Sequence, residues 1–194
     1  MKSELKNKLS LVGFRPLAFL AVFPFLACGC ASIDPARMVP ELQPRSEWKV
    51  SSSVKVMEVT SVQKSTFDGV SSNSMLANND MLVNEEQFKK ALILALEKSG
   101  LFSAVSIDEG DLYLYASIRS QDLSVPGWWF VAKIVVSYKF IDRAGNVIWL
   151  ESYESEFSHG FASNKTAEVR SREGSVRENL SSLMQGIRER WPKK

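Results

Sequence analysis

The sequence predicts an α+β fold in which an antiparallel sheet carries two helices on one face. Two observations indicate the sheet: residues 112–157 contain three runs of alternating apolar and polar side chains, and turn-forming residues separate these runs. A third observation indicates the helices, because residues 85–99 and 166–191 repeat apolar side chains every three or four positions. With a strand predicted at 48–60, the order is β-α-β-β-β-α, which is typical of a two-layer sandwich.

The first predicted strand is followed by a long segment of weak pattern. Residues 48–60 are rich in Val, Thr and Ser and favour a strand, whereas residues 61–83 are heavy in Ser and Asn. A loop of this length is uncommon inside a compact domain. We therefore expect the segment to be functional or mobile, or to contain a strand that the pattern does not reveal.

The first helix has signals at both ends. Asn84 and Gln87 stand at the spacing of a capping box, and Gly100 supplies the left-handed position that ends a helix. These signals predict a helix over 85–99. Its apolar stripe consists of Phe88, Ala91, Leu92, Ala95 and Leu96.

The three alternating runs predict a meander. In the first run the apolar side chains from Leu112 onward point to one face, so Tyr113 and Tyr115 point to the other. A turn at 125–127 and a hairpin loop at 142–146, whose glycine suits a positive φ, separate the strands. The inward side of the second strand consists of Phe130, Ala132, Ile134, Val136, Tyr138 and Phe140.

The last helix, over 166–191, should pack on the sheet beside the first one. Its apolar face is interrupted by Glu173, and Gly174 indicates a break near its start. The apolar positions are Val169, Val176, Leu180, Leu183, Ile187 and Trp191.

Length and composition exclude several classes of protein. The chain has 194 residues, 45% hydrophobic and 24% charged, which suits one globular domain and excludes low-complexity disorder and rod-like coiled coils. The formal net charge of +2 does not indicate a nucleic-acid partner. Only one stretch is long and apolar enough to be considered for a membrane, which excludes a polytopic membrane protein.

That stretch has the pattern of a secretory signal. Lys2, Lys6, Lys8 and Arg15 precede an apolar run over 17–27. Eleven residues make a helix of about 16 Å, too short for a hydrocarbon core of about 30 Å. The run therefore favours a signal peptide over a transmembrane anchor.

The residues after the run, Leu26-Ala27-Cys28-Gly29-Cys30-Ala31-Ser32, resemble the lipobox of bacterial lipoproteins. The resemblance implies cleavage before a cysteine that carries acyl chains such as palmitate. Cys30 is the better candidate and Cys28 the alternative. Because Ala31 is not Asp, the resemblance also implies the outer membrane, with the chain on its periplasmic face.

This interpretation divides the chain into three parts. Residues 1–29 are the signal peptide, 30–47 a lipidated tether, and 48–194 a single periplasmic domain. The tether contains three prolines and no sustained periodicity, so we expect an extended spacer. Removal of 1–29 takes away four basic and one acidic side chain, which leaves a net charge of −1 and no free thiol if Cys30 is acylated.

A second resemblance covers residues 50–190. The segment Phe88-Lys-Lys-Ala-Leu92, the run from Leu96 to Phe102, the strand pair and the last helix are similar to small periplasmic lipoproteins. These are the auxiliary lipoproteins of envelope transport and of polysaccharide or lipopolysaccharide assembly, and the N-terminal domain of the Tol-Pal protein TolB. The resemblance implies an assembly role, and no functional residue transfers with it.

The residues needed for catalysis or metal binding are sparse. His159 is the single histidine, with no nucleophile motif around it, and a zinc site would lack ligands. Asp108, Glu109 and Asp111 lack the regular spacing of a calcium loop and are ordinary for a turn. Phosphate-binding glycine motifs do not occur. We therefore predict no catalytic, cofactor or metal residue and expect that the protein is not an enzyme.

The sequence Trp128-Trp129-Phe130 is the candidate contact site. Consecutive residues of a strand point to opposite faces, so Trp128 and Trp129 cannot both enter one core. An exposed Trp is typical of protein interfaces and of the membrane headgroup layer. Tyr113 and Tyr115 could extend this patch. The alternative is that one Trp caps the core edge and the other covers a loop.

The main hypothesis is a non-catalytic lipoprotein that supports assembly of, or transport through, a cell-envelope complex. Its expected partners are the membrane, through the acyl groups, and an envelope protein complex, and copies could pair through free strand edges. One alternative is a carrier of lipid or another small ligand, which requires a deep apolar pocket. The other is a small envelope hydrolase using His159 or the carboxylates at 108–111.

Overall fold

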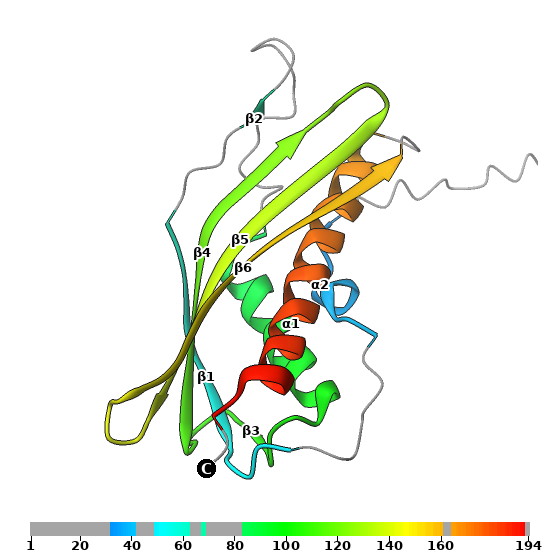
Figure 1. The fold of residues 1–194 in the computed structure, drawn as a ribbon. Coiled ribbons are helices and arrows are strands. Elements are labelled where there is room, and N and C mark those ends of the chain that lie inside the picture. Colours follow the sequence, from blue (N-terminus) through cyan, green and yellow to red (C-terminus); the bar gives the residue numbers. More distant parts are fainter. Residues whose placement is uncertain (1–31, 42–48, 63–66, 69–82, 161–163, 193–194) are drawn as a thin grey trace, which may run out of the picture. The chain divides into compact units, whose positions relative to one another are not determined.

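The protein is described here from a computed structural model (Figure 1). The structure describes residues 32–41, 49–62, 67–68, 83–160 and 164–192. The strands are β1 (Val54–Ser61), β2 (Phe67–Asp68), β3 (Val105–Ser106), β4 (Leu112–Ser124), β5 (Trp129–Asp142) and β6 (Val147–Gly160). The helices are the 3₁₀ turn η1 (Pro35–Met38), α1 (Glu85–Ser99) and α2 (Asn164–Arg190).

The sheet is mixed rather than wholly antiparallel. The strand order in the sheet is β3-β1-β4-β5-β6. Strands β4, β5 and β6 form the predicted antiparallel meander. Strands β1 and β4, however, are parallel, and β3 is parallel to β1. The prediction of an antiparallel sheet was wrong here because α1 carries the chain back across the sheet between β1 and β4, which makes a βαβ crossover.

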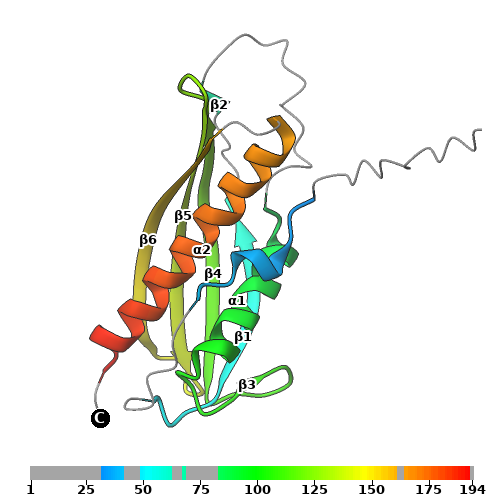
Figure 2. The same ribbon diagram turned by 90° about the vertical axis from the view of Figure 1, so that its right-hand side faces the viewer.

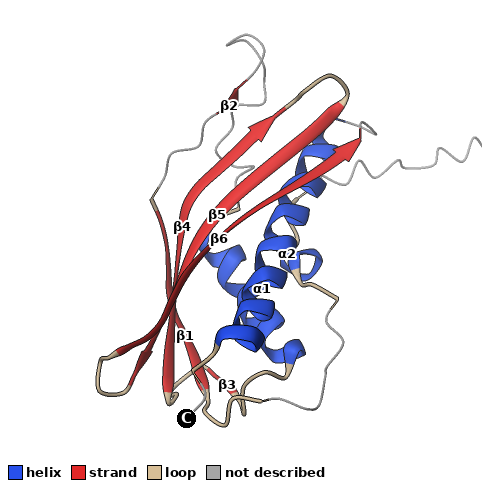
Figure 3. Ribbon diagram, in the orientation of Figure 1, coloured by secondary structure: helices blue, strands red, loops and turns tan. Residues whose placement is uncertain are grey.

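Both helices lie on one face of the sheet (Figures 2 and 3). The apolar stripe of α1 is buried against this face, and α2 lies along β5 and β6. At one end, Phe140 contacts Trp149 and Trp191 edge-on, with ring centroids 5.5 and 4.9 Å apart. No described helix or strand covers the opposite face of the sheet, so the fold is the predicted two-layer α+β sandwich.

The predicted ends of α1 are confirmed. The Asn84 side chain accepts a hydrogen bond from the Gln87 amide at 2.8 Å, and the Gln87 side chain accepts one from the Asn84 amide at 3.2 Å. Gly100 ends the helix with φ +59°, in the left-handed region.

The long segment over 61–83 includes residues that pair in the sheet. Phe67 and Asp68 pair in parallel with Leu123 and Ser124, so part of this segment is a strand, as one of the alternatives allowed. Residues 63–66 and 69–82 lie outside the described residues.

Helix α2 is continuous through Gly174, so the predicted break does not occur. This glycine serves close packing instead: a Cβ atom at position 174 would overlap the ring of Phe157 on β6. A Cβ atom at position 186 would likewise overlap the Tyr153 hydroxyl on β6. The two glycines therefore let α2 approach β6 more closely than any larger residue would.

We expect Gly174→Ala to lower the stability of the domain. Overpacking against Phe157 costs about 1–3 kcal/mol, which outweighs the gain of about 1 kcal/mol in helix propensity. The midpoint of urea unfolding should fall. Gln185→Ala, at an exposed position of the same helix, is the control and should leave the midpoint nearly unchanged. An unchanged midpoint for Gly174→Ala would mean that α2 and β6 are not in close contact at this level.

Candidate functional site

The candidate lipidation residues Cys30 and Cys28 lie outside the described residues, so the acyl anchor stays a prediction. Among the residues that the structure does describe, no helix is long and apolar enough to cross a membrane.

The residues that follow the candidate anchor pack onto the helices instead of forming an extended spacer. The described part of the expected tether, residues 32–41, contains η1 and buries Ile33, Met38 and Val39 in the main core. The Asp34 amide donates a hydrogen bond of 2.8 Å to Glu173 Oε1 on α2. The expectation of an extended spacer was therefore wrong for this part, because three apolar side chains find buried positions there.

Local chemistry explains why the chain turns at this point. The Asp34 side chain accepts a hydrogen bond of 3.0 Å from the Ala36 amide, and Pro35 occupies the first position of the turn. This capping starts η1 and directs Met38 toward the helices, where it is fully buried.

Glu173 has a structural role that its position in an apolar face only hinted at. It is buried on α2, accepts from the Asp34 amide, and lies 3.9 Å from an Arg37 guanidinium nitrogen. Burial raises the pKa of this carboxyl above its ordinary value, and the Asp34 amide and Arg37 oppose that rise. Glu173, the acidic residue in the apolar face of α2, thus attaches the N-terminal segment to this helix.

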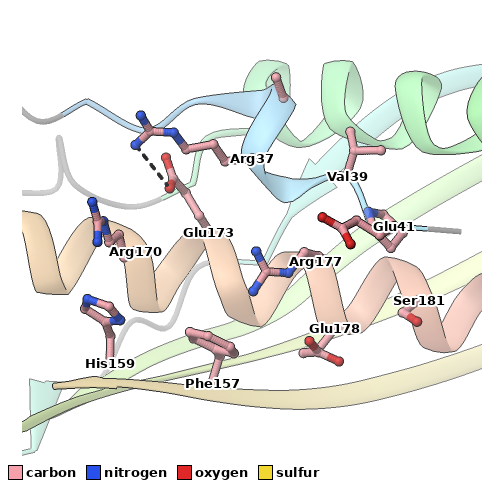
Figure 4. Close-up of a pocket in the computed structure, with 12 residues that line it drawn as sticks. Arg37, Val39, Glu41, Phe157, His159, Arg170, Glu173, Arg177, Glu178 and Ser181 are labelled. Atoms are coloured by element: carbon pink, nitrogen blue, oxygen red, sulfur yellow. Dashed lines mark ion pairs between the residues drawn. The ribbon is translucent and has the colours of Figure 1, made fainter.

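A pocket of about 900 Å³ lies between the N-terminal segment, α2 and β6 (Figure 4). Arg37, Arg170 and His159 lie toward one end of it, and Glu41 and Glu178 toward the other. Further along, the guanidinium of Arg177 lies over the Phe157 ring at 5.2 Å from its centroid, a cation–π contact. The lining is therefore largely charged, unlike the deep apolar pocket that a lipid carrier needs. No pattern in the sequence predicted this pocket.

The structure separates the aromatic triplet into surface and core. Trp128 is 74% exposed and Trp129 54% exposed at the tip of the β4–β5 hairpin, where Gly127 adopts φ +65°. The Trp129 ring lies against Gly160 of β6. Phe130 is only 2% exposed and packs in a small core with Leu123, Ala132 and Ala167. Its assignment to a contact surface was therefore wrong, because strand alternation turns it inward.

Tyr113 and Tyr115 do not extend the tryptophan patch. Both are half-buried on the uncovered face of the sheet, and the Lys139 ammonium lies 5.2 Å from the centroid of the Tyr115 ring. Tyr113 pairs with Ile141 near one end of β5, while Trp129 begins that strand. Twelve residues of strand separate these levels, a distance of about 40 Å.

The candidate catalytic groups are also far apart. His159 pairs with Phe130 in the sheet, whereas Asp111 precedes β4 at the opposite end, where Leu112 pairs with Asp142. Asp111 accepts hydrogen bonds from the Ser53 amide at 2.9 Å and hydroxyl at 2.8 Å, and these hold its pKa below the ordinary value. The carboxylate is thus engaged in joining β1 to β4. No group of three metal-ligating side chains is found within the described part of the chain.

These features define a class: a two-layer α+β domain with an exposed aromatic hairpin, a charged pocket and one uncovered sheet face. No family model and no curated protein matches the sequence. Solved structures share the fold. A DUF330 protein from Xanthomonas campestris superposes with a TM-score of 0.53 over 77% of this chain and 89% of its own, at 16% identity.

Other structural neighbours carry the name lipoprotein. A minor lipoprotein from Acinetobacter baumannii has a TM-score of 0.45 and 16% identity, covering 73% of this chain and 97% of its own. A lipoprotein from Neisseria meningitidis has a TM-score of 0.42 and 11% identity, covering 71% and 98%. At these identities the likeness concerns the fold alone.

The raised pKa of Glu173 predicts a pH-dependent stability. Between the ordinary value of 4.5 and the raised value, the folded state binds more protons than the unfolded state, so stability falls as pH rises through this window. Glu173→Gln keeps an acceptor for the Asp34 amide and removes the buried charge. We expect it to abolish this slope and to be at least as stable as the wild type at neutral pH. Thermal unfolding over a pH series measures both.

The control for that experiment is Glu173→Ala. It removes the acceptor of the Asp34 amide hydrogen bond and should lower the free energy of unfolding by about 1 kcal/mol. If Glu173→Gln lost as much stability at neutral pH as Glu173→Ala, the charge itself, and its pairing with Arg37, would be the stabilising feature.

Substitutions in the segment Trp128-Trp129-Phe130 should lower the free energy of unfolding by very different amounts. Phe130→Ala removes a buried ring and should cost about 3–5 kcal/mol. Trp128→Ala, at an exposed position, should change stability by about 0.5 kcal/mol or less. Denaturant unfolding compares the two, and equal losses would contradict the assignment of Trp128 to the surface.

Proposed function

We propose that this chain is a non-catalytic lipoprotein of the bacterial envelope, anchored by an acylated Cys30 to the periplasmic face of the outer membrane. Its α+β domain supports assembly of, or transport through, an envelope protein complex. The lipobox-like segment over 26–32 carries the anchor. The described fold supports it, because the domain begins at Ile33, directly after that segment.

The separation of reactive groups supports a non-catalytic role. A general acid or base must lie within hydrogen-bond reach of the group with which it exchanges a proton. His159 and Asp111 lie at opposite ends of the meander, and Asp111 is engaged by Ser53 and by Arg143, whose guanidinium lies 3.1 Å away. His159 and Asp111 therefore cannot act together on one substrate, and the Asp111 carboxylate is already engaged in structural contacts.

The uncovered sheet face and the β6 edge are the surfaces that we assign to a protein partner. This face carries Tyr115 and Val135, both half-buried, and Leu150, which is 63% exposed. Strand β6 is the outer strand, and no described strand pairs with its free edge over fourteen residues. Such an edge offers backbone donors and acceptors to another strand, from a partner protein or from a second copy.

The test begins with the native protein purified from membranes in mild detergent. The mass of its N-terminal peptide reports acylation, and the particle mass reports the assembly. We expect an acylated protein in a defined complex with an envelope protein or with further copies. Tyr115→Glu, on the uncovered face, should release the complex without changing acylation.

Lys98→Glu, on the exposed side of α1, makes a comparable change away from this face and should leave the complex intact. An unmodified Cys30 with an unmodified Cys28 would exclude the anchor. An acylated monomer that binds nothing, with or without Tyr115→Glu, would exclude the assembly role.

A further inference from the structure

We propose that the Trp128–Trp129 end of the domain rests on the bilayer that holds the acyl chains, with both indoles in the headgroup layer and nearby cationic side chains against anionic headgroups. This inference rests on the proposed acyl anchor. It adds an orientation and a second membrane contact, which anchoring alone does not require.

The length of chain between the anchor and the folded domain restricts where the bilayer can lie. Asp34 is fixed to α2 through Glu173, and it lies only four positions after Cys30. Four extended residues span about 14 Å, and the six from Cys28 about 21 Å. The fourteen residues of β5 are about 46 Å long. The acyl chains therefore cannot reach past the domain, and the bilayer must lie near the part that surrounds Asp34.

The tryptophan hairpin belongs to that part of the domain. The Ser171 hydroxyl of α2 donates a hydrogen bond of 2.8 Å to the Phe130 carbonyl, and Glu173 accepts from Asp34. Residues 171 and 173 differ by about 3 Å along the helix axis. Phe130 and Asp34 thus attach to α2 at one level, and Trp128 and Trp129 immediately precede Phe130. The β4–β5 hairpin and the first turns of α2 lie at the same end of the sheet (Figure 1).

The chemistry of this end fits a membrane surface. Indole combines an apolar ring with an N–H donor, and it concentrates in the headgroup layer of bilayers. Trp128 and Trp129 are exposed, while Trp149, toward the other end of the meander, is buried in the core. Among the tryptophans that the structure describes, Trp128 and Trp129 are the exposed ones, and they lie at the end to which the short connection leads.

Basic side chains of the pocket also lie toward the end of the domain that carries the tryptophan hairpin. Arg37, Arg170 and His159 lie at the end of the pocket toward the start of α2, and Glu178 lies further along the helix (Figure 4). Arg170 is exposed, and Arg37 is more than half exposed, although Arg37 pairs with Asp34 at 3.7 Å and with Glu173 at 3.9 Å. Cations near an anionic membrane surface are attracted to it. The exposed Arg170 thus adds a cation to the end of the domain that carries the indoles.

Tryptophan fluorescence in vesicles tests this orientation with the full-length acylated protein. The protein is reconstituted into vesicles of phosphatidylethanolamine and phosphatidylglycerol, with bromine on the lipid acyl chains near the headgroup. We expect brominated lipid to quench part of the emission. The double variant Trp128→Phe/Trp129→Phe should lose most of this quenching, because Trp149 is buried and Trp191 packs against Phe140 toward the opposite end of the meander.

The matched control adds an exposed indole elsewhere. Leu150→Trp, placed in the double variant, introduces a ring at an exposed position toward the other end of the meander, and its emission should stay unquenched. Quenching of this added indole as strongly as the native pair would overturn the orientation.

Mass analysis of the N-terminal peptide separates the two proposals. An acylated protein whose Trp128 and Trp129 are unquenched overturns this inference and leaves the anchor standing. An unacylated protein overturns both. Shielding of the two indoles from aqueous acrylamide in native membranes, without quenching in vesicles, would identify a protein rather than lipid on the hairpin, and would also overturn the inference.

Discussion

The attachment of α2 to strands β5 and β6 is the constraint on which the rest of the domain depends. Buried polar contacts join them: the Tyr138 hydroxyl donates to Asn179 Oδ1 at 2.7 Å, Asn179 donates to the Tyr153 carbonyl at 2.8 Å, and Ser155 donates to the Ser175 carbonyl at 2.8 Å. Buried polar groups must be satisfied to avoid a cost of about 1–3 kcal/mol each. The contacts therefore fix the register of α2 along the sheet, and apolar packing alone would leave it freer to slide.

This register determines the positions of the functional surfaces. The same helix holds the hairpin carbonyl of Phe130 through Ser171 and the N-terminal segment through Glu173. It also forms one wall of the charged pocket. A shift of α2 by one turn would separate these features by about 5 Å. The hairpin, the pocket and the chain that leads to the anchor are thus positioned by one element.

The sequence predicted the elements well and their tertiary relations poorly. Helix α1 and the meander follow from local signals, such as the Asn84–Gln87 box and the strict alternation in β5, which operate within a few residues. The parallel pairing of β1 with β4 depends on the path of the chain through α1, which periodicity does not encode. The contact between Asp34 and Glu173 joins residues 139 positions apart, and only the odd acidic residue in an apolar face hinted at it.

The candidate site shows the same division. Alternation along the second strand predicted that Phe130 points inward, and Phe130 is buried, so it could not also belong to the contact surface with Trp128 and Trp129, which are both exposed. Tyr113 and Tyr115 were grouped with the tryptophans because all are aromatic, although their register positions them far along the sheet. Composition identifies contact residues, whereas register decides which of them share a surface.

An anchor at one end of a long sheet also has consequences for the other surfaces. With the bilayer at the Trp128 end, the strands run away from the membrane, and the uncovered face and the β6 edge stay accessible along their length. The membrane contact and the protein contact therefore use different surfaces and do not compete.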